Sequence, residues 1–350
     1  MTERKTVTVA LSGGVDSTLT ARLLLDAGYG VSAATMLLFD GQDTESAAAM
    51  ADFLGIPHKV FDLRESFRDT VIRDFIGAYA KGVTPNPCMI CDFHIKFGAF
   101  YEAALAYFGA DFFATGHYAR ILWDGERKKY AVWKGLDAAK DQSYMMYHLT
   151  QAQLARILFP LGRFTKQETR RLSLEKGLPT HDKAESQDMC FLSAGDSYKD
   201  FLAARAPDIF REGDITDGKG RVLGRHRGLP LYTVGQRKGL GLSSPFPLYV
   251  TGLDAKRNRV IVGRNEDLFR NRLLADALDF TDGEPPAASF RCEAKIRYGM
   301  KASPASVTVQ DDGRAVIAFD APQRAVTPGQ SAVFYDGDRL IGGGTILRPL

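Results

Sequence analysis

The chain has 350 residues, 45% of them hydrophobic and 25% charged, with a net charge of +3. This composition excludes a disordered or fibrous chain, and the length suffices for two or three hydrophobic cores. No apolar run approaches the roughly 18 residues that a membrane-spanning helix needs, and the N-terminal MTERKTVTVALSGG lacks the apolar region of a signal peptide. Four cysteines are too few for a disulfide framework in a chain of this length. We therefore expect a cytoplasmic protein without a membrane partner.

The first predicted strand runs straight into a glycine-rich loop. Residues 6–11 read TVTVAL, residues 12–17 read SGGVDS, and the apolar spacing that follows predicts a helix that stops at Gly28. Glycines between a strand and a helix N-terminus let the backbone approach an anion, which the free N–H groups and the helix dipole stabilise. The loop is not a Walker motif. It predicts a phosphate site, and a tight turn with a helix N-cap is the structural alternative.

Strands and helices alternate after this loop. The sequence predicts strands over 31–38, 59–63 and 111–114, and a helix over 44–54. Such alternation is typical of a doubly wound parallel sheet in an α/β fold. Ligands bind outside the carboxyl ends of the strands in these sheets, so Ser12, Met36 and Gly116 are candidate contacts.

The hexapeptide SGGVDS resembles the PP-loop of ATP pyrophosphatases, which belong to the adenine nucleotide alpha hydrolase-like fold. The resemblance implies that the protein binds ATP and Mg²⁺, cleaves ATP to AMP and pyrophosphate, and adenylates an oxygen of its substrate. The nucleotide contacts that it implies are Ala10, Leu11, Ser12, Gly13, Gly14, Val15, Asp16, Ser17, Met36 and Gly116.

Two of the four cysteines, Cys88 and Cys91, follow two prolines in TPNPCMIC. A closed zinc site needs four nitrogen or sulfur ligands, often from two such pairs, and only one pair is present. A thioredoxin-like redox pair is disfavoured, because an ATP-binding loop precedes it in the chain. Thiol chemistry with the distant Cys190 and an iron–sulfur cluster on the three thiols both stay open. Cys292, in the predicted strand FRCEAKIRY, is interpreted as a small buried hydrophobic residue.

Seven further motifs resemble those of the tRNA-specific 2-thiouridylases. They occur in the same order as in that family and extend over nearly the whole chain. They are TPNPCMIC, HIKF, ATGHYAR, KGLDAAKDQSYMMYHL, SQDMCFL, YTVGQRKGLGL and VTPGQSAVFYDGDRLIGGGTI. The resemblance implies an enzyme that converts the wobble uridine (U34) of tRNAs for lysine, glutamate and glutamine to 2-thiouridine. It also implies ATP as cosubstrate and a persulfide sulfur donor such as a cysteine desulfurase or a sulfur carrier.

The resemblance assigns roles to the thiols as well. ATP adenylates the uracil O2, Cys190 carries the persulfide, and Cys91 is the catalytic thiol that closes a disulfide with Cys190, which an external reductant reopens. The alternative that it leaves open is a [4Fe-4S] cluster held by Cys88, Cys91 and Cys190. Asp92 departs from the family, which usually has asparagine there. A carboxylate beside Cys91 raises the thiol pKa unless Lys96 or a metal offsets it.

A long stretch of the chain, from Gly218 to Leu253, contains no acidic residue. It carries the cations Lys219, Arg221, Arg225, Arg227, Arg237 and Lys238, with Tyr232 and Tyr249 interleaved. Lysine and arginine neutralise phosphates, and aromatic faces stack on unpaired bases. A solvated loop face is the alternative. We expect a small central domain that contacts tRNA.

The resemblance also implies a set of tRNA contacts. These are Asn86, Pro87, Cys88, His117, Lys140, Asp141, Gln142, Arg237, Lys238, Arg297, Tyr298 and Gln330. Without the resemblance, Asp141 is interpreted as a helix cap, His117 as a satisfied core histidine and Gln330 as a turn residue.

The C-terminal segment changes character and shows strand, Asp-Gly turn, strand patterns in SVTVQDDGRAVIAFD and SAVFYDGDRLIGGGTIL. We expect an antiparallel β-barrel there. The predicted domains are a PP-loop domain over 1–205, a central tRNA-binding domain over 206–272 and the barrel over 273–350. The rival functions are a PP-loop ligase or amidotransferase acting on a small metabolite, and a non-catalytic tRNA-binding module with a structural metal.

Overall fold

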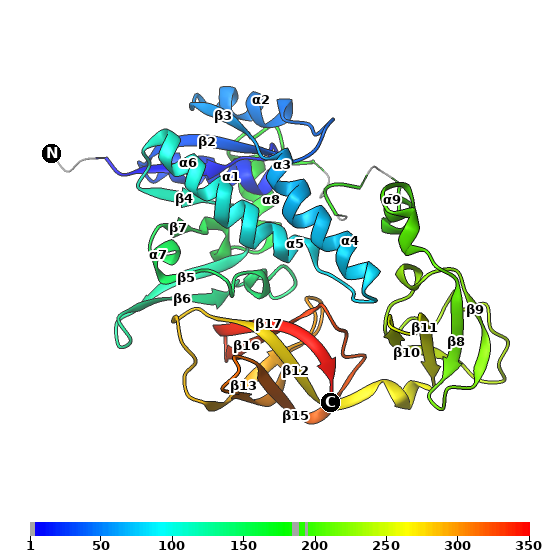
Figure 1. Cartoon of the computed structure of the whole chain (residues 1–350). Coiled ribbons are helices and arrows are strands. Elements are labelled where there is room, and N and C mark those ends of the chain that lie inside the picture. The colour runs from blue at the N-terminus through cyan, green and yellow to red at the C-terminus, as the bar shows by residue number, and fades with distance from the viewer. Residues whose placement is uncertain (1–3, 184–188, 193–194) are drawn as a thin grey trace.

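The computed structural model describes residues 4–183, 189–192 and 195–350 (Figure 1). The motif residues Ser186, Gln187 and Asp188, which precede Cys190, lie outside the described residues. Figure 1 shows an N-terminal α/β body above a C-terminal β-barrel, with a smaller mixed sheet beside both. Of the helices that the described residues form, none combines the length and the apolar character needed to cross a bilayer.

The N-terminal body is built on a parallel sheet with the strand order β3-β2-β1-β4-β7 among the described residues. Its strands are β1 (Thr6–Ala10), β2 (Gly30–Leu37), β3 (His58–Asp62), β4 (Phe112–Ala114) and β7 (Ile157–Leu158). The order reverses at β1, which pairs with β2 on one side and with β4 on the other. The four predicted strands are confirmed within one or two residues, as is the doubly wound α/β fold.

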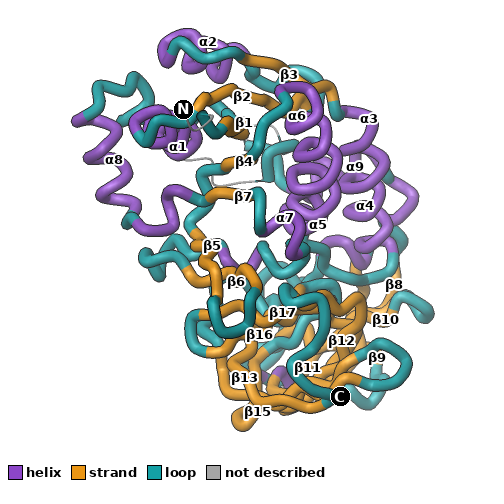
Figure 2. Tube along the Cα trace, turned by 90° about the vertical axis from the view of Figure 1, so that its left-hand side faces the viewer, coloured by secondary structure: helices purple, strands orange, loops and turns teal. Residues whose placement is uncertain are grey.

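Helices cover both faces of this sheet (Figure 2). The helical segments of this body are α1 (Val15–Asp26), α2 (Glu45–Leu54), α3 (Arg64–Phe67), η1 (Arg68–Ile72), α4 (Arg73–Ala80), α5 (Pro87–Ile90), η2 (Cys91–Ala99), α6 (Phe100–Phe108), η3 (Ser143–Met145), α7 (Gln151–Leu154), η4 (Pro160–Arg163) and α8 (Lys166–Glu175). On one face, Leu24 of α1 packs with Val7 and Val9 of β1. On the other, Phe100 of α6 packs with Phe113 of β4. The short apolar strands are therefore buried from both sides, as parallel sheets require.

The cysteine motif opens a long helical run, α5–η2–α6. Asn86 caps it, because its side-chain oxygen accepts the Met89 N–H, and Pro87 occupies the first helical position. The middle of the run, η2, is a π-helix with a non-helical residue, Gly98, at φ −101° and ψ −109°. Wide π-turns inside helices are frequent at functional sites.

The C-terminal body is an antiparallel barrel, as the hairpin patterns predicted. Its strands are β12 (Phe269–Phe280), β13 (Ser289–Lys295), β14 (Ser303–Val309), β15 (Ala315–Arg324), β16 (Ser331–Asp336) and β17 (Arg339–Pro349). The pairing of β12 with β17 closes the barrel around a core that includes Leu273, Ile317 and Phe334. A hairpin of β5 (Ala119–Asp124) and β6 (Lys129–Lys134) extends the barrel sheet toward the N-terminal body through β17. Cys292 packs against the barrel core, as expected.

The central body is a small mixed sheet with the strand order β10-β11-β8-β9. Its strands are β8 (Gly213–Asp217), β9 (Val222–His226), β10 (Tyr249–Asp254) and β11 (Arg259–Gly263), and its helical segments are α9 (Tyr198–Arg205), η5 (Pro207–Ile209), η6 (Leu229–Leu231) and η7 (Asn265–Leu268). Ile215, Val250, Val260 and Val262 form its own core. Most of the acid-free stretch therefore belongs to a separate body beside the barrel.

Candidate functional site

The glycine-rich loop joins β1 to α1 with a fixed internal hydrogen-bond pattern. Ser17 Oγ accepts the Ser12 N–H at 3.1 Å, lies 3.1 Å from Ser12 Oγ, and donates to the Gly14 carbonyl at 3.2 Å. Gly13 has φ +71°, and a Cβ there would lie 2.7 Å from the carbonyl carbon of Ser46. Only glycine fits that position. Within the part of the chain that the structure describes, no side chain caps α1, so the N-terminal N–H groups of this helix are open to an anion.

A cavity of about 730 Å³ opens at the carboxyl ends of β1, β2 and β4. All of the predicted nucleotide contacts line it except Gly13. The residues that line it are Ala10, Leu11, Ser12, Gly14, Val15, Asp16, Ser17, Ala34, Thr35, Met36, Gln42, Asp43, Lys96, Phe100, Thr115, Gly116, His117, Tyr118, Lys140, Gln142, Lys166, Lys183 and Tyr298. A Cβ on Gly116 would lie 3.0 Å from the Asp16 backbone, so this glycine allows β4 and α1 to approach closely.

Two lysines that motif reasoning missed reach the loop from the segment around α8. Lys166 Nζ lies 2.7 Å from both carboxylate oxygens of Asp16, which also accepts the Tyr118 hydroxyl at 2.8 Å. Lys183 Nζ donates to the Gly13 carbonyl and to Ser46 Oγ, both at 3.2 Å. No local pattern marks these lysines in the sequence, because they lie some 150 residues or more from the loop that they contact.

His117 is buried, and it lines the cavity as well. Its Nδ1 lies 2.6 Å from the Thr115 hydroxyl, and its Nε2 lies 3.4 Å from Lys96 Nζ. Burial, and then the charge of Lys96, lower the pKa of His117 to about 3 against the opposing effect of Asp92. The imidazole is therefore neutral at physiological pH. His117 is thus a buried and hydrogen-bonded histidine, as the sequence alone indicated. It also lines the cavity, which makes it a candidate site residue.

Lys96 connects the nucleotide cavity to the cysteines. It lines the cavity and pairs with the buried carboxylate of Asp92, one turn earlier on η2. Burial alone would lower the pKa of Lys96, but Asp92 and the Cys91 sulfur outweigh it and raise the pKa. The ammonium therefore stays charged. Asp92, the departure from the family pattern, is thus offset by Lys96.

The three predicted thiols lie close enough for their charges to interact. Cys91 is buried, whereas Cys88 and Cys190 are exposed, and none of them forms a disulfide. Burial raises the pKa of Cys91 well above its usual range, Lys96 opposes this effect, and Asp92, Cys190 and Cys88 add to it. Although Cys190 is exposed, the surrounding protein desolvates its sulfur and raises its pKa to about 11, with Cys88 adding to the shift and Lys96 opposing it. All three cysteines are therefore thiols at neutral pH.

The cysteines do not form a ligand set as they are placed. Across the described ranges, no three His, Cys, Asp or Glu side chains are grouped so that they could hold a metal ion. Mg²⁺ is less demanding, since it commonly binds through one or two carboxylates together with substrate phosphates. Asp16 and Asp43 both line the cavity, so the residues present fit a magnesium ion carried by a nucleotide.

Two of the predicted tRNA contacts in the turn before η3 line the same cavity, and the third does not. Lys140 and Gln142 line it. The Asp141 carboxylate is buried and accepts the Gly135 N–H at 3.1 Å and the Ser143 N–H and Oγ–H at 3.0 Å each. Asp141 therefore stabilises the turn, a role close to that of the helix cap that the sequence alone indicated.

The barrel contributes Tyr298 to the wall of the cavity, with 43% of the residue exposed. Its neighbour Arg297 donates to the Ala325 carbonyl and to Thr327 Oγ1. Gln330 donates to backbone carbonyls of the segment that leads into α5. The structure thus brings only the first of these three predicted contacts to the cavity.

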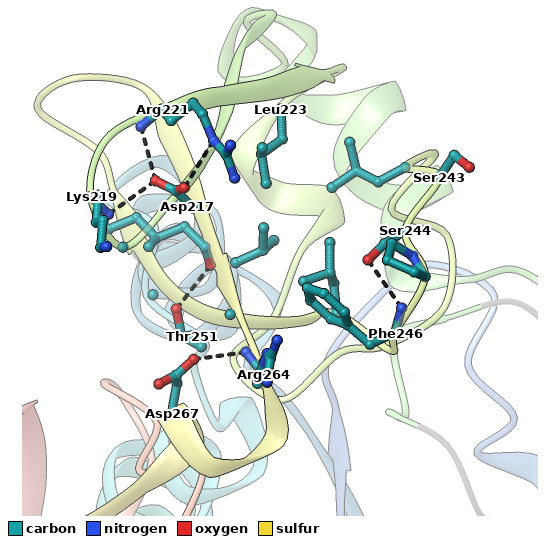
Figure 3. A pocket seen from close by; sticks show the side chains of 18 of the residues that line it. Asp217, Lys219, Arg221, Leu223, Ser243, Ser244, Phe246, Thr251, Arg264 and Asp267 are labelled. Carbon is teal, nitrogen blue, oxygen red and sulfur yellow. Dashed lines mark hydrogen bonds and ion pairs between the residues drawn. The ribbon is translucent and has the colours of Figure 1, made fainter.

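The central body carries a second and larger cavity, of about 1060 Å³, shown in Figure 3. Lys219, Arg221, Arg264 and Arg270 surround an apolar floor, and the Arg264 guanidinium lies 4.3 Å from the centre of the Phe246 ring. Among the residues that the structure describes, the charged side chains that line this cavity are these four cations and the carboxylates Asp217 and Asp267, so the lining is net basic. Arg237 and Lys238 are exposed on the same body.

The parallel sheet, the SGGVDS loop and the cavity beside it define an ATP-using PP-loop enzyme domain. Three family profiles match the chain: a "tRNA methyl transferase HUP domain" over residues 5–194, a "tRNA methyl transferase PRC-barrel domain" over 199–264 and an "Aminomethyltransferase beta-barrel domain" over 270–346. The chain belongs to the family of the tRNA-specific 2-thiouridylases.

Its relatives are similar over their full length. The protein named tRNA-specific 2-thiouridylase MnmA from Chloroflexus aggregans is 47% identical, over 98% of this chain and 98% of that protein. The protein of the same name from Magnetococcus marinus is 46% identical, over 99% of this chain and 100% of that protein. A solved structure titled as a predicted subunit of tRNA methyltransferase from Methanocaldococcus jannaschii matches 49% of this chain and 75% of its own, at 20% identity and a TM-score of 0.31.

Proposed function

We propose that this protein thiolates C2 of the wobble uridine (U34) in tRNA at the expense of ATP, giving 2-thiouridine. The observation that carries the proposal is the position of Lys96. It lines the nucleotide cavity, and its charge acts on Cys88, Cys91 and Cys190. An adenylation site and a set of thiols are thus adjacent, as activation followed by sulfur transfer requires. The relatives described above are named tRNA-specific 2-thiouridylases, which supports the proposal.

The first proposed step is activation of the base. The open N–H groups of the glycine loop hold the phosphates of ATP, and Lys166 and Lys183 supply positive charge beside them. The uracil O2 attacks the α-phosphorus, pyrophosphate leaves, and C2 then carries an adenylate as leaving group. Mg²⁺, held by the phosphates with Asp16 or Asp43, would neutralise phosphate charge. The base must be splayed out of its stack for C2 to be reached.

The second proposed step is sulfur transfer. The terminal sulfur of a persulfide on Cys190 attacks C2, and AMP departs with the former O2. The Cys91 thiolate then attacks the inner sulfur of Cys190. This breaks the S–S bond, leaves the outer sulfur on C2 as the thiocarbonyl, and joins Cys91 to Cys190 in a disulfide. A two-electron reductant reopens the disulfide. Lys96 stabilises the Cys91 thiolate once the proton has left.

The iron–sulfur alternative uses the same three cysteines. As placed, they do not form a ligand set, and no step is derived through a cluster. The experiment is anaerobic purification with iron and sulfide analysis, followed by a thiolation assay with ATP and tRNA that compares a persulfide donor with free sulfide. We expect iron-free protein to be fully active with the persulfide donor. Stoichiometric iron, with activity lost on its removal, would establish the cluster route.

A PP-loop ligase that acts on a small metabolite is the rival function, because it needs the loop but not the thiols. Cys190→Ser separates the two. We expect this variant to lose thiolation and to keep its affinity for tRNA, because Cys190 is an exposed side chain outside the cores. Unchanged activity would favour the ligase, and a large loss of affinity would make Cys190 a structural residue.

We propose that the tRNA crosses all three bodies, divided as predicted at residues 205 and 272. The cavity side supplies Asn86, Pro87, Cys88, His117, Lys140 and Gln142, the barrel supplies Arg297 and Tyr298, and the central body supplies Arg237 and Lys238. The basic cavity in Figure 3 supports a role of the central body in phosphate binding. The tRNAs for lysine, glutamate and glutamine, a cysteine desulfurase or sulfur carrier as donor, and a cytoplasmic location complete the proposal.

A further inference from the structure

The segment that leads into the cysteine helix, residues 82–86, lies where the three bodies meet (Figure 1). At its start, a Cβ on Gly82 would lie 3.3 Å from Leu253 Cβ and 3.6 Å from Ala255 Cβ, both in the central body. At its centre, Thr84 is hydrogen-bonded to the barrel. The path of this segment is therefore set by contacts with the two other bodies.

One turn of the barrel, residues 327–330, holds this segment by three hydrogen bonds. The Thr84 N–H donates to the Pro328 carbonyl at 3.1 Å. The Gln330 side-chain amide donates to the Thr84 carbonyl at 3.0 Å and to the Pro85 carbonyl at 3.2 Å. Both backbone polar groups of Thr84 are thus satisfied by the barrel, and Pro85 has no N–H to satisfy.

The fit between turn and segment is close. Gly329 has φ +89°, and a Cβ there would lie 2.3 Å from Val83 Cγ1 and 2.8 Å from the Thr84 carbonyl oxygen. The turn itself is fixed in the barrel, because the Gly329 N–H donates to the Ile346 carbonyl and the Ile346 N–H donates to the Gln330 carbonyl, both at 2.8 Å. Gln330 therefore acts from a rigid element.

Few freely rotating backbone torsions separate the contact of Gln330 with Thr84 and Pro85 from the thiols. Pro85 and Pro87 each have a fixed φ. Asn86 caps α5, and Cys88 is its second residue. The direction of the Cys88–Cys91 turn therefore follows from where Gln330 holds Thr84 and Pro85.

We propose that Gln330 is a positioning residue for sulfur transfer, which rests on the function proposed above. Its amide fixes the entry to the cysteine helix against the barrel, so that Cys91 is presented to Cys190. The barrel thereby sets the geometry of a thiol that belongs to another body.

The test compares Gln330→Ala and Gln330→Glu with the matched control Gln323→Ala. Gln323 is a buried barrel glutamine whose amide bonds only within the barrel, to the Ala321 carbonyl and Ser303 Oγ. The readouts are hydrogen exchange of the Thr84 amide, the alkylation rate of Cys91, tRNA affinity and the single-turnover thiolation rate.

For Gln330→Ala we expect Thr84 exchange and Cys91 alkylation to rise about tenfold, as for removal of a hydrogen bond of ordinary strength. Thiolation falls by a similar factor, and tRNA affinity changes less than about twofold. Gln330→Glu, which turns a carboxylate toward two carbonyl oxygens, has the larger effect on all three rates. Gln323→Ala lowers barrel stability without changing Thr84 exchange.

Two results would overturn the proposal. Loss of tRNA affinity with unchanged Thr84 exchange would make Gln330 a tRNA contact. Faster exchange with unchanged Cys91 alkylation would make the turn a purely structural contact. Exchange and alkylation need no tRNA, so they decide the positioning role even if the wild-type protein forms no 2-thiouridine, which would count against the proposed function alone.

Discussion

Lys183 shows how a single side chain completes the nucleotide site from outside the glycine loop. Its ammonium bonds to the Gly13 carbonyl and to Ser46 Oγ, and its charge contributes to the lowered pKa of Asp43, for which the Ser46 hydrogen bonds are the main cause. An ammonium beside the open N–H groups of the loop favours the binding of a phosphate. Charged hydrogen bonds of this kind are worth about 1.5–3 kcal/mol.

Lys183→Met should therefore raise the KM for ATP in pyrophosphate release by about 10- to 100-fold, with the fold unchanged. The matched control is Lys176→Met, because Lys176 pairs with Asp26 at 2.6 Å and does not line the cavity. The measurement is steady-state pyrophosphate release at varied ATP. Equal KM values for the two variants would remove Lys183 from the phosphate site.

The raised pKa of Cys190 gives a second prediction for a single residue. The thiolate is the form that reacts with alkylating agents, and at pH 7 the group, with a pKa of about 11, is protonated. Its alkylation rate should rise about tenfold per pH unit from pH 7 to 10, whereas an unperturbed cysteine levels off near pH 8.5. Mass spectrometry of the Cys190 peptide measures this rate. A plateau below pH 9 would contradict the expected desolvation by the surrounding protein.

The glycine loop illustrates how an element imposes residue types. Gly13 and Gly55 both have positive φ, +71° and +65°, but only at Gly13 would a Cβ meet backbone atoms, those of Ser46 and Ala47. Gly55 ends α2 in open space. Substitutions at these two glycines therefore distinguish the effect of backbone strain from that of a steric clash.

Both Gly13→Ala and Gly55→Ala should lower the free energy of unfolding by about 1 kcal/mol or more, because alanine is strained at positive φ. Only Gly13→Ala should also abolish pyrophosphate release, because the loop must move away from α2 to admit the methyl group. Thermal unfolding and the release assay, run on both variants, decide this. Full activity of Gly13→Ala would show that the loop tolerates displacement.

Elements whose signal is local were predicted from the sequence, and contacts across the fold were not. The apolar runs of β1, β2 and β4, the Asp-Gly hairpins of the barrel and the glycine loop each carry their pattern within a few residues. Lys166 meets Asp16 across 150 positions, and Gln330 meets Thr84 across 246. Such pairs depend on how the bodies pack. The interpretation of Gln330 as a turn residue is confirmed, but no local pattern marks the carbonyls that its amide binds.

On the scale of the whole molecule, the positive charge of the central body should make the affinity for tRNA depend on the salt concentration. Lys219 and Arg264 line the cavity in Figure 3, where the Asp217 carboxylate pairs with Arg221. Among the described residues, neither the Lys219 ammonium nor the Arg264 guanidinium forms an ion pair, so both can reach a phosphate.

The double variant Lys219→Ala, Arg264→Ala should weaken tRNA binding about equally for all tRNA sequences. The slope of log K against log salt should flatten by about 0.7–0.9 for each phosphate that the variant no longer neutralises. Arg22→Ala is the control, since Arg22 lies on α1 and pairs with Asp26. An unchanged slope would take the central body out of the interface.

The strand β17 has a consequence for the order in which the protein becomes competent during synthesis. It pairs with β16, with β12 and with β6, and its residue Ile346 fixes the turn that carries Gln330. The ribosome makes β17 after every other strand of the three bodies. A nascent chain therefore lacks the anchor of the entry to the cysteine helix until β17 has been made. The core that packs under the parallel sheet also includes Leu340 of β17, so the last strand completes both the sheet's packing and the placement of the thiol.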